Sequence, residues 1–396
     1  MKNSLNISVA GEDLISTVDD STNRLFINGT EVPSTSWTGS GTYSTTVNGH
    51  AITITQVEDT TGNVAIRRTA AYTYELYKIR TRYQSNRNLL DNWYFVGGGS
   101  QNGYGVFPIN QRRQTSYSNN GFCIDRWRLR HDGSSTAQVS ISSSGVTLTC
   151  DGTNLQGITQ SIGAFKNLLG KTVTISLLVT NYTGVNQLEV GLWFSNTSYG
   201  YTTNVGRMLV SSSGLHTATI QIPNEIPEIS GSPAALLNFG IASFVGSPGA
   251  KTISFIAAKL EIGSTQTLAH QENGTWVLNE LPDYDEQWTK CRKYLITSTW
   301  DTGDYLAGYG NASNATTVNV YFPIGGMVKN PTISPTTGSN WILRGNGQSI
   351  TPTEISSWFA STNVLGVKFT ASGLTANQIY VANSNSATLV TFSAEP

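Results

Sequence analysis

The chain has 396 residues, which at roughly 100–200 residues per domain predicts two to four domains. Only 12% of the residues are charged and the formal net charge is -1, which excludes the basic surface typical of nucleic-acid-binding proteins. Ser, Thr, Asn and Gly fill most non-apolar positions, and aromatic residues make up 10% of the chain. Because Thr, Tyr and Trp favour strands, and Gly and Asn favour tight turns, this composition predicts an all-β protein.

The opening residues, MKNSLNISVAGEDLI, carry a single lysine and no uninterrupted apolar stretch. We therefore expect no secretory signal, and no later window is long enough to predict a membrane span. The composition nevertheless resembles the surface of an extracellular lectin. A virion protein, which is assembled in the host cytoplasm and released by lysis, satisfies both observations, so we expect a virion location.

Residues 1–80 have the pattern of a small β module. Strand-like runs flank Asn28-Gly29 and Asn48-Gly49, the dipeptide most typical of two-residue hairpins, and NVAIRRTAAYTYELYKI adds two more runs. The basic stretch at 81–87 follows, and its arginines have no apolar partners at strand or helix periodicity. We interpret this stretch as a linker behind the β module.

Residues 88–265 contain many short alternating runs, which predict a two-sheet sandwich or jelly roll. In IDRWRLR, Trp127 and Leu129 alternate with arginines, so we expect the first two in the core and the arginines on a solvated face. A binding site for an anionic wall polymer is the alternative for this basic group. The arginines concerned are Arg112, Arg113, Arg126, Arg128 and Arg130.

Residues 266–295 form a predicted connector with the one convincing helical pattern of the chain. Asp283 and Glu286 have the spacing of a capping box, and apolar residues recur behind them at helical spacing. The pattern predicts a short amphipathic helix over 284–293. Its apolar positions are Trp288, Cys291, Tyr294 and Leu295, and we assign Trp288 and Tyr294 to the core or to a trimer axis. Residues 296–396 return to strand-like alternation, which predicts a C-terminal β-sandwich domain.

Several segments carry a resemblance to a known family. NLLDNWYFVGG, FPINQRRQTSYS and GFCIDRWRL resemble the opening of the carbohydrate-binding-module-like jelly rolls in tail proteins of phages and prophages of Gram-positive hosts. AAKLEIGSTQT resembles the last strand of that module, and LAHQENGTWVLNELPDYDEQWTKCRKYL is similar to the junction that leads into the distal domain. The resemblance covers residues 88–295 and is weaker at WTGSGTY and VTFSAEP.

The resemblance implies a homotrimeric tail fibre whose N-terminal part attaches to the tail and whose C-terminal part meets the cell. Related modules carry acidic calcium ligands near their first and last strands, where this chain offers only Asp91 and Glu261. Calcium needs six to eight oxygen ligands, so we expect no cofactor and keep calcium only as a less favoured alternative. The three cysteines, Cys123, Cys150 and Cys291, lack metal-ligand spacing and are expected to be buried free thiols.

Catalytic motifs are missing from the sequence. The four histidines lie far from any nucleophile-elbow pattern, and GGGSQNGYG is better explained as a loop than as a phosphate-binding turn. Glycoside hydrolysis needs only two suitably spaced carboxyl groups, so that reaction stays open. Its best candidates are Asp301 and Asp304, then Glu225 and Glu228. We expect a protein that is not an enzyme.

Sugar binding requires flat apolar rings beside amide or carboxyl groups, and two segments have that composition. GLWFSNTSYGYTTN supplies the first set of candidates, for which a core position of the tryptophan is the alternative: Trp193, Asn196, Tyr199 and Tyr201. TWDTGDYLAGYGNASN supplies the second set, for which a subunit contact is the alternative: Trp300, Asp301, Asp304, Tyr305, Tyr309 and Asn311.

The leading hypothesis is a non-catalytic, trimeric receptor-binding tail fibre that adheres to a bacterial cell-surface polysaccharide. Its expected partners are that glycan, two further copies of the chain and the phage tail or baseplate proteins, with no nucleic acid and no membrane insertion. A structural tail or baseplate component without glycan binding is the first alternative. A glycan depolymerase is the second.

Overall fold

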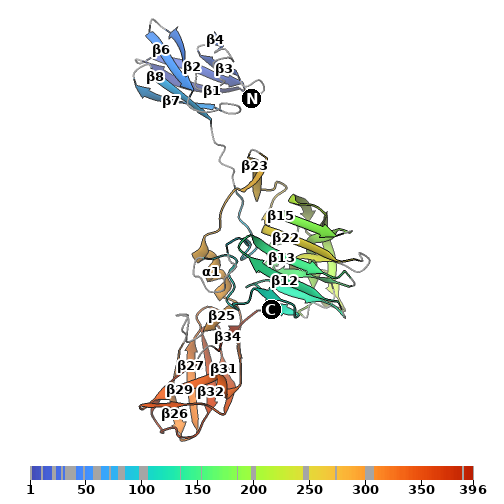
Figure 1. Cartoon of the computed structure of the whole chain (residues 1–396), viewed down its shortest axis with the longest axis vertical. Helices are drawn as coiled ribbons and strands as arrows, with labels where there is room; N and C mark the ends of the chain where they lie inside the picture. The colour runs from blue at the N-terminus through green and yellow to red at the C-terminus, as the bar shows by residue number, and fades with distance from the viewer. Residues whose placement is uncertain are drawn as a thin grey trace. The chain divides into compact units, whose positions relative to one another are not determined.

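The structure is a computed structural model with two compact units, Met1–Tyr83 and Gln84–Pro396 (Figure 1). It describes strand residues 2–9, 12–19, 24–27, 30–31, 42–47, 50–56, 64–70 and 73–78 of the first unit, and residues 85–97, 106–133, 135–152, 154–184, 186–197, 202–243, 249–272, 274–298, 307–385 and 388–395 of the second. The described chain is mostly β strand with a single α-helix, which confirms the all-β prediction.

The first unit contains two four-stranded sheets. One has the order β1 (Lys2–Val9), β2 (Glu12–Asp19), β3 (Arg24–Ile27) and β4 (Thr30–Glu31). The other has the order β5 (Thr42–Val47), β6 (His50–Gln56), β8 (Thr73–Lys78) and β7 (Val64–Ala70), with β6 and β8 parallel. Ile27 pairs with Thr30 and Val47 with His50, so both predicted Asn-Gly hairpins are confirmed.

Two six-stranded antiparallel sheets form a jelly roll in the second unit. The β14–β21 sheet has the order β10 (Gly121–Phe122), β11 (Arg128–His131), β14 (Gln156–Ser161), β21 (Leu236–Ser243), β16 (Leu188–Ser195) and β17 (Thr202–Val210). The β15–β22 sheet has the order β18 (Gly214–Gln221), β15 (Thr172–Gly184), β22 (Lys251–Ile262), β13 (Gly145–Cys150), β12 (Ala137–Ser142) and β9 (Ser116–Tyr117). Smaller elements are η2 (Phe165–Leu168), β19 (Glu228–Ile229), β20 (Ser232–Pro233), β23 (Ala269–Glu272) and β24 (Thr275–Leu278).

Aromatic rings from both sheets and from the segment ahead of them fill the jelly-roll core. Phe95 lies edge-on to Trp127, with ring centroids 5.4 Å apart, and to Phe255, at 5.1 Å. The Trp127 indole N–H donates to the carbonyl oxygen of Asn92 at 3.0 Å, so its polar atom is satisfied inside the core. Trp127 and Leu129 are fully buried, as the sequence predicted.

Arg126 contradicts the predicted solvated arginine row. It precedes β11, has a φ of 71° and is only 2% exposed. Its guanidinium donates to Asp91 at 3.1 Å and to the carbonyl oxygen of Ser161 at 2.8 Å, and lies 3.4 Å from the ring centroid of Tyr294. The strand β11 begins only at Arg128, so its alternation does not predict the burial of Arg126, which precedes the strand.

The C-terminal part of the second unit is a separate two-sheet sandwich. Its small sheet has the order β25 (Leu295–Ser298), β34 (Val390–Ser393) and β28 (Thr332–Ser334). Its large sheet has the order β30 (Gln348–Ile350), β29 (Trp341–Gly345), β33 (Ile379–Ser384), β26 (Gly308–Asn314), β27 (Thr317–Pro323), β32 (Val364–Thr370) and β31 (Glu354–Ala360), and η3 (Gly338–Asn340) precedes β29. Phe322, Trp341 and Phe369 meet edge to face at 5.3–5.6 Å in its core.

The helix α1 (Tyr284–Arg292) connects the two sandwiches and confirms the predicted helix. Asp283 accepts a hydrogen bond from the N–H of Glu286 at 2.9 Å, which satisfies one free donor of the first turn. Cys291 is fully buried against Phe107 and Ile109 of the jelly-roll segment. All three cysteines are buried and free, as predicted, and burial raises the pKa of the Cys123 and Cys150 thiols to about 12. None of the described helices has the length and apolar character of a membrane span.

A buried polar network holds the jelly roll against the C-terminal sandwich. Gln111 donates to Asp125 at 2.6 Å and to the carbonyl oxygen of Leu295 at 2.8 Å. Arg112 forms ion pairs with Glu395 and, at 3.6 Å, with Asp125. We call Gln111, Arg112, Asp125 and Glu395 the junction network. Because these groups come from both sandwiches and are mostly removed from water, their pairing fixes how the two meet.

Both acids of the junction network have raised pKa values. Burial raises the pKa of Asp125 to about 6 and that of Glu395 to about 7, and the nearby Arg112 and Arg126 guanidiniums oppose this rise. The Glu395 Oε1 atom is buried without a hydrogen-bond partner among the described residues. A carboxyl group with a raised folded-state pKa stabilises the protein fully below its unfolded pKa and loses that contribution as the pH rises through the folded value.

We therefore predict that Glu395→Gln, which imitates the protonated acid, gains stability relative to the parent protein between pH 5 and pH 8. The expected gain in unfolding free energy is on the order of 2 kcal/mol, measured by urea denaturation at the two pH values. Glu228→Gln, at an exposed position, is the control and should show no such change. A Glu395→Gln difference that stays constant with pH would contradict the prediction.

Candidate functional site

The outer face of the seven-stranded sheet carries exposed aromatic rings. In β27, Val320 and Phe322 belong to the core, so Tyr321 between them points away from it. Tyr309 of β26 pairs directly with Tyr321 and therefore shares its side of the sheet. Further along the same row lie Trp358 and Phe359 of β31. We call these four aromatic residues and their polar neighbours Asn311, Asn319, Ser356 and Lys368 the aromatic face.

Strand register places the four rings in one row. Tyr321 pairs with Gly366 of β32, and Gly366 pairs with Phe359. A register shift between Ser357 and Phe359 inserts an extra residue, so Trp358 and Phe359 are both exposed although they are consecutive. The exposed fractions are 58% for Tyr309, 44% for Tyr321, 49% for Trp358 and 46% for Phe359. A contiguous exposed apolar patch indicates an interaction site, whereas singly scattered exposed apolar residues do not.

Gly366 gives the Trp358 indole its position. A Cβ atom at Gly366 would lie 3.0 Å from the indole nitrogen of Trp358 and 3.0 Å from the Cβ of Phe359. The indole therefore rests on the glycine backbone, between Phe359 and Tyr321. The rings of Tyr321 and Trp358 are 5.6 Å apart and inclined by 68°, and those of Trp358 and Phe359 are 6.2 Å apart and inclined by 49°.

Polar side chains form a second row beside the rings. Asn311 pairs with Asn319, Asn319 with Lys368, and Lys368 with Ser356, so one polar group stands on each of the four strands. Asn311, Lys368 and Ser356 are exposed and Asn319 is half-buried. Amide and ammonium groups hydrogen-bond to hydroxyl and acidic groups of a ligand, while aromatic rings pack against its apolar surface. Of β26, β27, β32 and β31, only β31 carries an acidic residue, Glu354.

The structure brings together two of the predicted candidates, Tyr309 and Asn311, on the aromatic face. Four others lie outside the described residues: Trp300, Asp301, Asp304 and Tyr305. The sequence analysis missed Tyr321 and Trp358. In TVNVYFP, strand alternation places Tyr321 on the opposite side from Val320 and Phe322, which predicts an exposed ring. In SSWFA, the consecutive residues Trp358 and Phe359 cannot both face one core in a regular strand, so at least one of them is predicted to be exposed.

The jelly-roll candidates lie in the other sandwich. Trp193 alternates with the core residues Leu192 and Phe194, so it lies on the outer face of the β14–β21 sheet. It is only 5% exposed, and its ring approaches the backbone of Gly240, where a Cβ would lie 3.0 Å from Cζ3. Asn196 is half-buried beyond the end of β16. Tyr199 and Tyr201 lie outside the described residues.

The outer face of the β14–β21 sheet has small residues in its middle and arginines at its sides. Register aligns Arg128, Thr159, Gly240, Gly191 and Arg207 across five strands. Arg128 is half-buried, Arg207 is 51% exposed and pairs with Glu189 at 2.8 Å, and the Thr159 hydroxyl is buried without a described partner. Among the residues that the structure describes, the exposed aromatic rings that stacking requires lie on the C-terminal sandwich.

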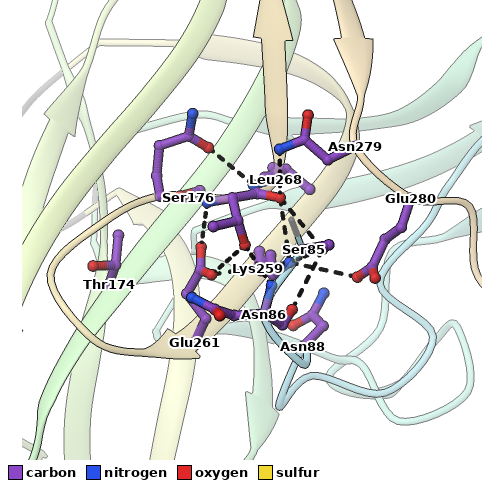
Figure 2. A network of polar contacts seen from close by, with 12 residues as sticks. Ser85, Asn86, Asn88, Thr174, Ser176, Lys259, Glu261, Leu268, Asn279 and Glu280 are labelled. Carbon is purple, nitrogen blue, oxygen red and sulfur yellow. Dashed lines mark hydrogen bonds and ion pairs between the residues drawn. The ribbon is translucent and has the colours of Figure 1, made fainter. Parts of the chain in front are cut away.

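A further buried ion pair lies on the outer face of the β15–β22 sheet (Figure 2). The fully buried ammonium of Lys259 is 2.5 Å from the Ser85 hydroxyl, 3.4 Å from Glu280 and 4.0 Å from Glu261. Glu261 accepts from the N–H of Thr267 at 2.7 Å and from its hydroxyl. The pair therefore fastens the segments that precede and follow the jelly roll to one sheet face.

The two acids that lie where related modules carry calcium ligands are both paired with cations. Glu261 faces Lys259, and Asp91 faces Arg126 at 3.1 Å. Both carboxylate oxygens of Glu261 also accept hydrogen bonds from Thr267, so these residues do not fit calcium. Among the described residues, no three His, Cys, Asp or Glu side chains are grouped to hold a metal ion.

Comparisons with known proteins return structural similarities only. No family model matches the sequence, and no curated protein matches it. A family 11 carbohydrate-binding module of Clostridium thermocellum is 11% identical, covering 38% of this chain and 95% of its own, with a TM-score of 0.24. The CBM22-1 xylan-binding domain of Paenibacillus barcinonensis Xyn10C is 14% identical, covering 38% and 94%, with a TM-score of 0.22. The xyloglucanase domain of NopAA from Sinorhizobium fredii is 12% identical, covering 37% and 99%, with a TM-score of 0.24. At these TM-scores the similarities define neither a family nor an activity for this chain.

We predict that Lys259→Met destabilises the second unit by about 3–5 kcal/mol, because it leaves the carboxylate of Glu261 buried without a cation. The double variant Lys259→Met/Glu261→Gln should recover much of this loss, since no uncompensated charge remains. Chemical denaturation followed by tryptophan fluorescence measures both effects. Equal losses in the single and double variants would show that the ion pair itself is not responsible.

Proposed function

We propose that the protein is a non-catalytic component of a phage tail fibre that binds a bacterial surface glycan through the aromatic face of its C-terminal sandwich. The observation that carries this proposal is the row of exposed rings formed by Tyr309, Tyr321 and Trp358, with a parallel row of amide, hydroxyl and ammonium groups. Aromatic rings stack on the C–H faces of sugar rings, and the polar groups hydrogen-bond to the hydroxyls at the sugar edge.

The polar row favours a sugar over a protein as the ligand. A protein–protein contact of this kind depends on an apolar centre with few charged side chains, whereas here Asn311, Asn319 and Lys368 form a polar row parallel to the row of rings. A glycan presents apolar C–H patches and hydroxyl groups in the same alternation. The aromatic face therefore matches a glycan in both kinds of group.

The setting in a virion rests on the sequence resemblance at residues 88–295. In this proposal the first unit attaches the protein to tail or baseplate proteins, and three copies of the chain form the fibre. Stacking of a few sugars gives weak binding at each face, and linking several faces raises the overall affinity through effective concentration. The proposed localisation is the phage tail, assembled in the host cytoplasm.

The test is binding of the fluorescently labelled full chain to an array of bacterial surface polysaccharides and to intact cells. Tyr321→Ala and Trp358→Ala should each weaken binding by about tenfold or more, because each removes a stacking ring. Val328→Ala is the matched control, since Val328 is 47% exposed in the same sandwich and its N–H bonds to the carbonyl oxygen of Lys293 at the junction.

Light scattering and a reducing-end assay distinguish the other roles. If the parent chain binds no polysaccharide and Trp358→Ala dissociates a trimer, the aromatic face is a subunit contact and the protein is a structural tail component. If the bound polysaccharide releases new reducing ends during incubation, the protein is a depolymerase. The proposal expects a trimer that survives the substitution and a polysaccharide that stays intact.

A further inference from the structure

Building on the proposed function, we infer that the aromatic face binds one extended oligosaccharide chain that crosses strands β26, β27, β32 and β31 and contacts the protein through several consecutive sugars. A single terminal sugar and the flat surface of a crystalline polysaccharide are both poorer matches. Three features of the face carry this inference: the length of the ring row, its direction relative to the strands and the inclination of its rings.

The ring row is too long for one sugar. Tyr309 stands on β26, Tyr321 on β27 and Trp358 on β31, with Gly366 of β32 between the last two. Four neighbouring strands at about 4.8 Å spacing span roughly 14 Å of sheet. This length exceeds a single pyranose ring, so a ligand that uses Tyr309 and Trp358 together must contain several sugars.

The direction of the row follows from register. A chain lying along one strand would meet a single ring, because the outward residues of β27 are Thr317, Asn319, Tyr321 and Pro323. A chain lying across the strands meets a ring on three of them and a polar group on all four. The polar row lies one strand repeat from the rings, roughly 7 Å away, so it faces the hydroxyl edge of a chain that covers the rings.

The inclination of the rings around Trp358 favours a single chain over a flat ligand. Tyr321 and Trp358 are inclined by 68°, and Trp358 and Phe359 by 49°, so their faces point in different directions. A planar layer of sugars, as on a crystalline polysaccharide, cannot lie flat on Trp358 and on either of these two neighbouring rings at the same time. A single chain whose sugars turn from one unit to the next can place a different sugar on each ring.

The position of Trp358 depends on the absence of a side chain at Gly366, so a substitution at Gly366 offers a second way to test the site. Because a Cβ at Gly366 would lie 3.0 Å from the indole nitrogen, Gly366→Ala should displace the indole without removing it. Affinity for a chain that spans Trp358 and Tyr321 should fall, while contact of a short fragment with Tyr309 is unchanged.

The experiment uses the full chain and the array polysaccharide with the strongest signal. Partial acid hydrolysis and size fractionation give fragments from single sugars to hexasaccharides, and calorimetry measures the affinity of each. We expect affinity to rise by about tenfold or more from single sugars to tetrasaccharides, then to level off. Tyr309→Ala and Trp358→Ala, at opposite ends of the row, should each lower hexasaccharide affinity by roughly fivefold to tenfold, and disaccharide affinity much less.

Matched variants and two further outcomes complete the test. Tyr309→Phe keeps the ring and should retain most of the affinity, and Val328→Ala should change nothing. Affinity that is independent of fragment length, or retention on crystalline cellulose or chitin with no binding of soluble fragments, overturns the inference and leaves glycan binding intact. If the protein binds none of the polysaccharides on the array, both the proposed function and this inference are wrong.

Discussion

The two-sided geometry of a β strand is the constraint on which the candidate site depends. The C-terminal sandwich needs Val318, Val320 and Phe322 for its core, and this choice sends Asn319 and Tyr321 to the opposite side of β27. Each neighbouring strand repeats the choice in register, so the outward residues line up in rows across the sheet. The aromatic row and the polar row are therefore consequences of the same pairing that builds the core.

Charged residues are few in this chain, and several of them are buried where segments must be held together. Arg126 pairs with Asp91 beneath Tyr294, and Lys259 pairs with Glu261 beneath the segments that flank the jelly roll. Burying an ion pair contributes little net stability, but an unpaired partner is costly. These pairs therefore mainly disfavour conformations in which the flanking segments are undocked, because undocking leaves a buried charge without its partner.

Local signals in the sequence predicted the secondary structure well because they act over a few residues. The Asn-Gly hairpins and the Asp283 cap depend only on backbone geometry near those residues. Positions that depend on distant chain segments were not predictable in this way. Arg126 is buried because Asp91, Ser161 and Tyr294 arrive from elsewhere, and Trp193 is buried although its strand alternation points it away from the core.

The low net charge and the exposed rings have a joint physical consequence. With a formal net charge of -1, the chain has little overall repulsion to oppose contacts between exposed apolar surfaces. Interruption of the aromatic face by Asn311, Asn319 and Lys368 limits this tendency, because any apolar surface that covered the rings would also have to remove these groups from water. A glycan hydroxyl replaces that water with a hydrogen bond, and a hydrocarbon surface does not. In the proposed function, the polar row would therefore both select the ligand and keep the rings available for it.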